Sequence, residues 1–154
     1  MDPRLESLAK LFEAYIPKGS GVLLACSGGP DSQCLLDLCG QLQTTTEIGP
    51  LVAVGLDHGL RPEASSELDL VETLARAHNI PFERRPLKLS NSGNLMENAR
   101  NARYEALRKI AFDNQIQFIA TGHTSTDQAE TILFNLTRGS GPTGASGMQL
   151  LSGD

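Results

Sequence analysis

Long hydrophobic runs are absent from this 154-residue sequence. No apolar stretch approaches the roughly 20 residues that a membrane-spanning helix needs. The amino-terminal residues also lack the basic start and apolar segment of a secretion signal. These absences predict a cytoplasmic protein without a membrane partner.

Cysteine is scarce, with three residues at Cys26, Cys34 and Cys39. The number is odd and no Cys-x-x-Cys spacing occurs, which argues against a disulfide framework and against a cysteine zinc site. We expect these cysteines to be reduced, buried and small apolar in character.

Excess positive charge is absent too, because the formal net charge is −5. This balance argues against a protein that coats nucleic acid by bulk charge. Residues 84–109 nevertheless carry seven basic and two acidic side chains, a local charge of +5 between more acidic flanks. Such a segment is either a solvated helix face or a surface that faces phosphate groups.

Neither a repeat nor a linker interrupts the sequence, so residues 1–154 form one expected unit. Apolar periodicity predicts helices that alternate with short apolar strands. The expected helices are 5–15, 31–42, 63–78, 91–112 and 127–136, and the expected strands are 21–26, 51–57, 80–87 and 117–121.

This alternation predicts an α/β fold of three layers, with a parallel sheet of at least four strands between two layers of helices. In such sheets, ligands bind beyond the carboxyl ends of the strands, near the point where strand order reverses. The motifs described next all follow predicted strands.

A glycine turn with the sequence Ser-Gly-Gly-Pro-Asp-Ser links the first strand to its helix. Glycine lets backbone N–H groups turn toward an anion, and a helix N-terminus favours phosphate. The serine hydroxyls could add donors, whereas the alternative is an ordinary capped turn. The candidate pyrophosphate-binding residues are Ser27, Gly28, Gly29, Pro30, Asp31 and Ser32.

The turn resembles the Ser-Gly-Gly-x-Asp-Ser motif of the PP-loop ATP pyrophosphatases. It has neither the Gly-Lys-Ser/Thr of kinases and GTPases nor the Gly-x-Gly-x-x-Gly of dinucleotide-binding proteins. The resemblance implies a Rossmann-like PP-loop fold and ATP as a substrate, cleaved between its α and β phosphates to adenylate a second substrate. It does not specify that second substrate.

A second motif, His-Gly-Leu-Arg-Pro-Glu, follows the second strand. It resembles an element of the lysidine synthases that lies near adenine, which implies that Asp57, His58 and Arg61 contact ATP. The alternative is a plain loop in which Pro62 and Glu63 suit the first turn of a helix.

A third motif places Arg100 and Arg103 three residues apart, on one face of a helix. It resembles the family's Ala-Arg-x-x-Arg-Tyr sequence, which implies that Arg103 stabilises the phosphate transition state and that Arg100 contacts substrate or tRNA. The alternative is an exposed basic face. Arg84, Arg85 and Lys88 are weaker candidates for contact with tRNA phosphates.

A fourth motif follows the fourth strand and contains His123, Asp127 and Glu130. Its spacing fits a capping box at a helix start as well as a pair of carboxylates for an ammonium group or Mg²⁺. The resemblance implies that Asp127 and Glu130 lie near a lysine substrate, and that His123 or a carboxylate accepts its proton. Thr126 replaces an aspartate that lysidine synthases carry.

A glycine-rich segment contains Arg138, which the resemblance makes a further candidate for substrate or tRNA binding. The segment could equally be a simple connection. The motif matches extend from about residue 21 to residue 148, nearly the whole sequence.

The resemblance as a whole implies the amino-terminal catalytic domain of a lysidine synthase, shortened at its carboxyl end. Such a domain binds ATP with Mg²⁺, for which Asp31 is the candidate ligand. It adenylates C2 of the wobble cytidine in the CAU anticodon of tRNA(Ile), and the ε-amine of lysine displaces AMP. Two alternatives are a PP-loop tRNA thiolase, which usually has paired cysteines, and a nucleotide-binding fragment without turnover.

Overall fold

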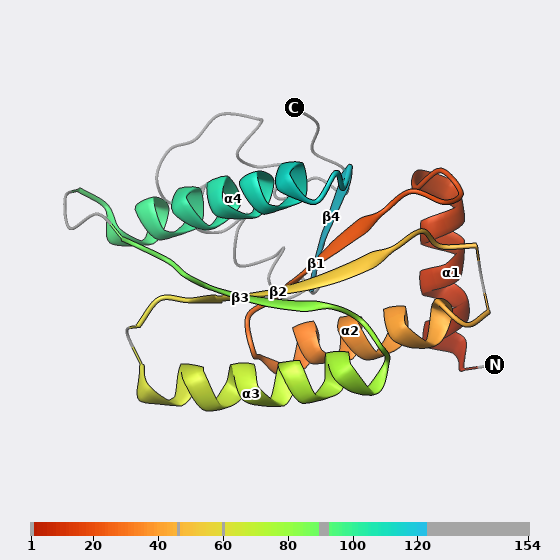
Figure 1. Cartoon of the computed structure of the whole chain (residues 1–154), viewed down its shortest axis with the longest axis horizontal. Helices are drawn as coiled ribbons and strands as arrows, with labels where there is room; N and C mark the ends of the chain where they lie inside the picture. The colour runs from red at the N-terminus through yellow and green to blue at the C-terminus, as the bar shows by residue number, and fades with distance from the viewer. Residues whose placement is uncertain (1, 46, 60, 90–92, 123–154) are drawn as a thin grey trace, which may run out of the picture. The chain divides into compact units, whose positions relative to one another are not determined.

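The computed structural model describes residues 2–45, 47–59, 61–89 and 93–122 (Figure 1). Helices and strands alternate in the order α1 (Pro3–Tyr15), β1 (Val22–Cys26), α2 (Pro30–Leu42), β2 (Leu51–Asp57), α3 (Pro62–Ala77), β3 (Phe82–Pro86), α4 (Leu95–Asp113) and β4 (Phe118–Thr121). The helix expected over 127–136 lies outside the described residues.

The four strands form one sheet in the order β3-β2-β1-β4, and every neighbouring pair is parallel. In the register of the central strand, Val22 pairs with Leu51 of β2 on one side and with Phe118 of β4 on the other. The parallel sheet predicted from the alternating pattern is therefore confirmed.

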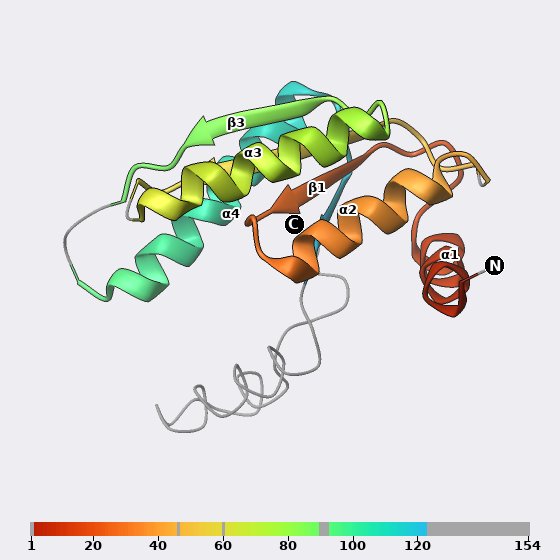
Figure 2. The ribbon, with the colours of Figure 1, turned by 90° about the horizontal axis from the view of Figure 1, so that it is seen from below.

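Helices cover both faces of this sheet (Figures 1 and 2). The helices α2 and α3 lie on one face, with α1 beside α2, and α4 lies on the other. Successive side chains of a strand point to opposite faces of the sheet. Because both faces are covered by helices, all five residues of β1 are buried. Leu24 belongs to the apolar cluster under α2 and α3, and its neighbour Leu23 to the cluster under α4.

The strand order reverses between β1 and β4. The chain proceeds from β1 to β3 through α2 and α3, then crosses the opposite face through α4 and returns beside β1. Gly122 follows β4, and a methyl group on it would lie 3.0 Å from the carbonyl oxygen of Asp31. The end of β4 therefore touches the start of α2, at the place where sheets of this kind bind ligands.

Two predicted boundaries differ from the structure for local reasons. The helix expected from residue 91 begins at Leu95, because the side chain of Asn94 caps it by accepting bonds from the N–H groups of Met96 and Glu97. The strand expected from residue 80 begins at Phe82. Ile80 is buried in the turn after α3, where its N–H group donates to the carbonyl of Ala75 at 2.9 Å.

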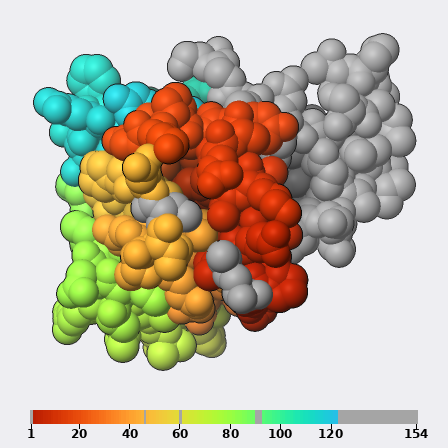
Figure 3. Space-filling model, turned by 90° about the vertical axis from the view of Figure 1, so that its right-hand side faces the viewer, coloured from red at the N-terminus to blue at the C-terminus, as the bar shows by residue number. Residues whose placement is uncertain are grey.

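The end of the sheet at which the strands begin is formed by the connections that lead into the strands, with α1 beside them (Figure 3). None of the predicted site residues that the structure describes lies in these connections. Across the described ranges, no helix combines the length and the apolar character that a membrane crossing requires.

Candidate functional site

The loop between β1 and α2 is held in shape by its own serine side chains. Ser32 is buried, and its hydroxyl donates to the carbonyl of Gly29 at 3.0 Å and accepts from the N–H of Ser27 at 3.2 Å. Gly28 has a φ of +87°, a backbone conformation that residues with a side chain rarely adopt. The Ser32 hydroxyl therefore maintains the loop, whereas the sequence suggested that it could donate to phosphate.

The first turn of α2 offers backbone donors to an anion. The N-cap residue, Gly29, makes no capping bond through a side chain, and Pro30 occupies the first turn. Asp31 is also in that turn and is exposed. The unpaired N–H groups and the partial positive charge of a helix start attract phosphate groups.

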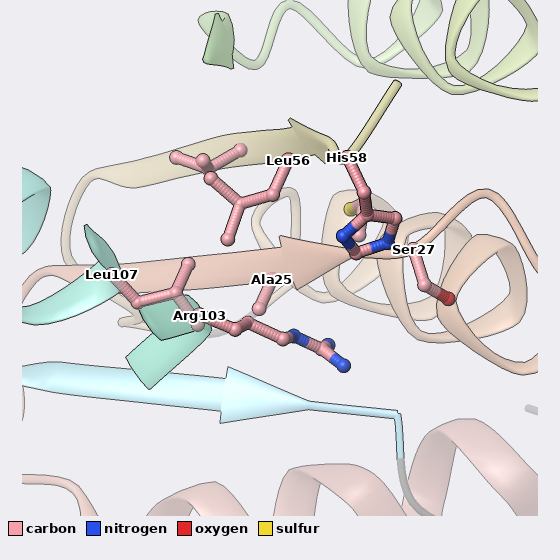
Figure 4. Close-up of a pocket in the computed structure, with 8 residues that line it drawn as sticks. Ala25, Ser27, Leu56, His58, Arg103 and Leu107 are labelled. Atoms are coloured by element: carbon pink, nitrogen blue, oxygen red, sulfur yellow. The ribbon is translucent and has the colours of Figure 1, made fainter. Parts of the chain in front are cut away.

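A small pocket lies beside this loop, at the carboxyl ends of β1 and β2 (Figure 4). Its volume is about 20 Å³, enough for one water molecule, so it cannot enclose a nucleotide. Its lining residues are Ala25, Cys26, Ser27, Val54, Leu56, His58, Arg103 and Leu107. The pocket thus brings together Ser27, His58 and Arg103, one residue from each of three predicted motifs.

Arg103 reaches this pocket from α4, on the far side of the sheet from α2. Its side chain runs along β1 toward the carboxyl end of the strand (Figure 4). Among the residues that the structure describes, no carboxylate forms an ion pair with Arg103. An unpaired guanidinium beside the loop suits an incoming phosphate.

The thiol of Cys26 also lines the pocket, yet it stays protonated. Burial raises its pKa from 9.0 to about 12, against a smaller opposing effect of Arg103. Burial likewise raises the pKa of Cys39 to about 12. The expectation of buried cysteines is confirmed for these two and wrong for Cys34, which is exposed on the outward side of α2, opposite Leu36.

Only one of the three candidates in the second motif faces the pocket. His58 lines it, whereas Asp57 accepts a bond from the N–H of Gly59 at 2.9 Å and shapes the turn after β2. The guanidinium of Arg61 lies 3.3 Å from the carboxylate of Glu67, and 65% of the Arg61 side chain is exposed.

Glu67 is a residue that the sequence motifs missed. It lies on α3, and a methyl group on Gly28 would meet its Cβ at 2.7 Å. The contact places a carboxylate directly beside the loop between β1 and α2. Its nearest signal in the sequence is its position between Ala64 and Leu68, two residues on the inward face of the helix.

The basic segment over 84–109 is not one continuous cationic surface. Arg84 pairs with Asp69 at 2.6 Å, and Arg85 pairs with Glu83 at 3.0 Å. Arg100 is exposed, and its guanidinium lies 5.8 Å from the ring centre of Tyr104. The basic side chains of this segment thus make different contacts. Lys88 is exposed.

Metal ligands do not cluster within the described ranges, where no three His, Cys, Asp or Glu side chains come together. Near the loop, Asp31 is the candidate ligand. This arrangement fits Mg²⁺, which proteins hold through one or two carboxylates and the phosphates of the substrate. The candidates His123, Asp127, Glu130 and Arg138 lie outside the described residues.

Solved structures share this fold at low sequence identity. The U34-tRNA thiolase NcsA from Methanococcus maripaludis superposes with a TM-score of 0.76 at 19% identity, over 88% of this chain and 50% of that chain. The NH3-dependent NAD synthetase from Campylobacter jejuni gives a TM-score of 0.52 at 14% identity, over 88% of this chain and 72% of that one. These similarities concern the fold alone.

Sequence relatives are much more similar. A tRNA(Ile)-lysidine synthase from Haemophilus ducreyi is 42% identical over 138 residues, which are 90% of this chain and 31% of the relative. Another from Bradyrhizobium sp. is 44% identical over 138 residues, 86% of this chain and 38% of the relative. The chain therefore spans about a third of the length of these curated relatives.

The resemblance seen in the motifs is confirmed by these relatives, and the PP-loop fold by the strand order and the solved structures. A family model described as a PP-loop domain matches residues 2–153. The chain therefore belongs to the PP-loop domain family, whose members bind ATP.

Proposed function

We propose that this chain carries the ATP-dependent step of a tRNA(Ile)-lysidine synthase. The observation that carries the proposal is the convergence, at the carboxyl ends of β1 and β2, of the loop over 27–32, here called the phosphate loop, with His58 and with Arg103, which has no carboxylate partner among the described residues. The names of the relatives support lysine and tRNA(Ile) as the other substrates.

ATP binds with its phosphates at the loop over 27–32 and the start of α2. Adenylation of the wobble cytidine in the CAU anticodon forms a bond between the oxygen on C2 and the α phosphate, breaks the bond between the α and β phosphates and releases pyrophosphate. The N–H groups of Asp31 and Ser32, together with the guanidinium of Arg103, offset the negative charge on the separating group. His58 and Asp57, at the end of β2, lie toward the nucleoside.

The ε-amine of lysine then attacks C2, and AMP leaves. Asp127 and Glu130 orient the lysine ammonium, and His123 or one of these carboxylates takes its proton. These residues follow Gly122 in the sequence, and Gly122 contacts the start of α2. Holding the substrates together accounts for much of the rate in such a reaction.

Asp31, exposed in the first turn of α2, is the residue that would hold Mg²⁺ in this proposal. When bound, the ion offsets charge on the leaving pyrophosphate. Arg100, which is exposed on α4, and Arg138 contact tRNA or substrate in this proposal.

Exchange of labelled pyrophosphate into ATP tests the reaction. We expect exchange that depends on tRNA(Ile), and lysine-dependent formation of AMP and lysidine. Incorporation of sulfur in place of lysine would show a thiolase instead. Binding of ATP in calorimetry without release of AMP would show a nucleotide-binding domain without turnover.

The thiolase alternative has little support in the cysteines of this chain. Cys26 and Cys39 are buried with pKa values raised to about 12, and Cys34 lies on the exposed side of α2. A sulfur carrier needs an accessible thiolate. No pair of the three cysteines meets that requirement.

A further inference from the structure

A carboxylate lies against the phosphate loop, where an anion binds in the proposed function. Glu67, on α3, is close enough to Gly28 that an added methyl group would lie 2.7 Å from its Cβ and 3.2 Å from its Oε2. Only 34% of the Glu67 side chain is exposed. An unpaired carboxylate here would repel the phosphates of ATP.

Arg61 neutralises this carboxylate. The two side chains approach to 3.3 Å, and they come from the start and the second turn of the same helix. Arg61 is itself the N-cap residue of α3, but a guanidinium has only donors and cannot accept bonds from the N–H groups of the helix start. The ion pair therefore places the guanidinium beside the phosphate loop rather than over the end of its own helix.

A guanidinium on a long side chain needs a partner to stay in one place. The Arg61 side chain is 65% exposed, and ordering a free arginine side chain costs conformational entropy. Glu67 is held by its contact with Gly28, so it can anchor the more mobile partner.

We infer that Glu67 is a positioning residue, which holds the Arg61 guanidinium at the phosphate loop so that Arg61 can contact the outer phosphates of ATP. The inference rests on the proposed binding of ATP at this loop. Glu67 acts through Arg61 and does not itself touch the nucleotide.

The test is calorimetric titration of the 154-residue chain with Mg-ATP and with AMP, which lacks the pyrophosphate. We expect Glu67→Ala to raise the Kd for ATP about fivefold, or about 1 kcal/mol, and to leave the Kd for AMP unchanged. Arg61→Met should weaken ATP binding by at least that factor, because it also leaves the Glu67 carboxylate unpaired beside the loop. Adding Glu67→Ala to Arg61→Met should cause no further loss, because both changes remove the same contact.

Glu72→Ala is the matched control, since Glu72 forms an ion pair with Arg76 on the same helix at 3.0 Å. It should bind ATP as the unchanged chain does. Unaltered or tighter ATP binding by Glu67→Ala would overturn the inference. So would an equal loss of AMP binding, or a further loss in the Arg61→Met background, since either would indicate a structural role.

The control titration separates this inference from the proposal on which it rests. Failure of the unchanged chain to bind ATP would overturn the proposed function and the inference with it. Normal ATP binding by the unchanged chain, with no effect of Glu67→Ala, would overturn the inference alone.

Discussion

Arg103 is the side chain that links α4 to the phosphate loop. Its guanidinium is unpaired among the described residues, and it lies in a pocket with Ser27 and His58. Arg103 is half-buried, and a guanidinium without a carboxylate partner is available to bind an anion. In the proposed reaction, the phosphates of ATP are that partner.

Replacing Arg103 with Met should lower the rate of pyrophosphate exchange by about 10²–10³-fold, since one preformed contact to developing charge is lost. The apolar stem is retained, so the melting temperature should stay close to that of the unchanged chain. Lys109→Met removes one charge from an exposed position of the same helix and is the control. Equal losses in the two variants would contradict a specific role for Arg103.

The cysteines differ in exposure, and this difference can be measured. At pH 8, iodoacetamide should modify Cys34 alone in the folded chain, because Cys26 and Cys39 are buried and their pKa values are raised to about 12. Mass spectrometry should therefore find one rapidly modified thiol, and three after unfolding. Rapid modification that persists in Cys34→Ser would disprove the assignment.

At the scale of the element, the loop between β1 and α2 depends on close packing against α3. Gly28 combines a φ of +87° with a contact to Glu67 that leaves no room for a methyl group. Gly19 has a similar φ of +78°, but no atom lies within 4 Å of the place where its methyl group would be. Comparing alanine substitutions at the two positions therefore distinguishes the cost of backbone strain from the cost of the steric conflict with Glu67.

Gly19→Ala should lower the free energy of unfolding by about 1–2 kcal/mol, the cost of left-handed backbone for a residue with a side chain. Gly28→Ala should lower it by about 1–3 kcal/mol more, because Glu67 must also move. Urea denaturation of both variants measures the difference. Equal losses would mean that the loop yields without strain and that the contact with Glu67 is loose.

Elements were largely predictable from the sequence, because the spacing of apolar residues is a local property. The predicted strand over 51–57 coincides with β2, and α2 extends the predicted 31–42 by one residue, Pro30. The errors arose where a local bond decided the boundary, as at Asn94, which caps α4 with its own side chain. Periodicity cannot locate such a bond.

At the scale of the whole molecule, the buried thiols should make the free energy of unfolding fall as the pH becomes alkaline. Cys26 and Cys39 have raised pKa values of about 12 in the folded chain, against 9.0 in an unperturbed thiol. The unfolded chain therefore loses these protons first as pH rises. Their stabilising contribution is complete below pH 9 and is lost between pH 9 and about pH 12.

Each buried cysteine should reduce the free energy of unfolding by about 2 kcal/mol between pH 8 and pH 10.5. Between these two pH values, the free energy of unfolding of Cys39→Ala should fall by about 2 kcal/mol less than that of the unchanged chain. The free energy of unfolding of Cys34→Ala, which removes an exposed thiol, should fall as much as that of the unchanged chain. Urea denaturation at the two pH values measures the losses. Parallel behaviour of all three proteins would contradict the raised pKa of Cys39.

Local patterns in the sequence were enough to predict the order of helices and strands, the glycine turn after β1 and the family resemblance, because turn residues and apolar periodicity act between near neighbours in the chain. Which candidate residues meet depends on how distant segments pack in three dimensions. Arg103 joins Ser27 because α4 crosses to the second face of the sheet and brings β4 back beside β1. Glu67 reaches the loop at Gly28 because α3 packs against that loop, and Arg61 pairs with Glu67 and does not line the pocket. Such meetings depend on crossovers and packing between distant segments, which no local pattern encodes.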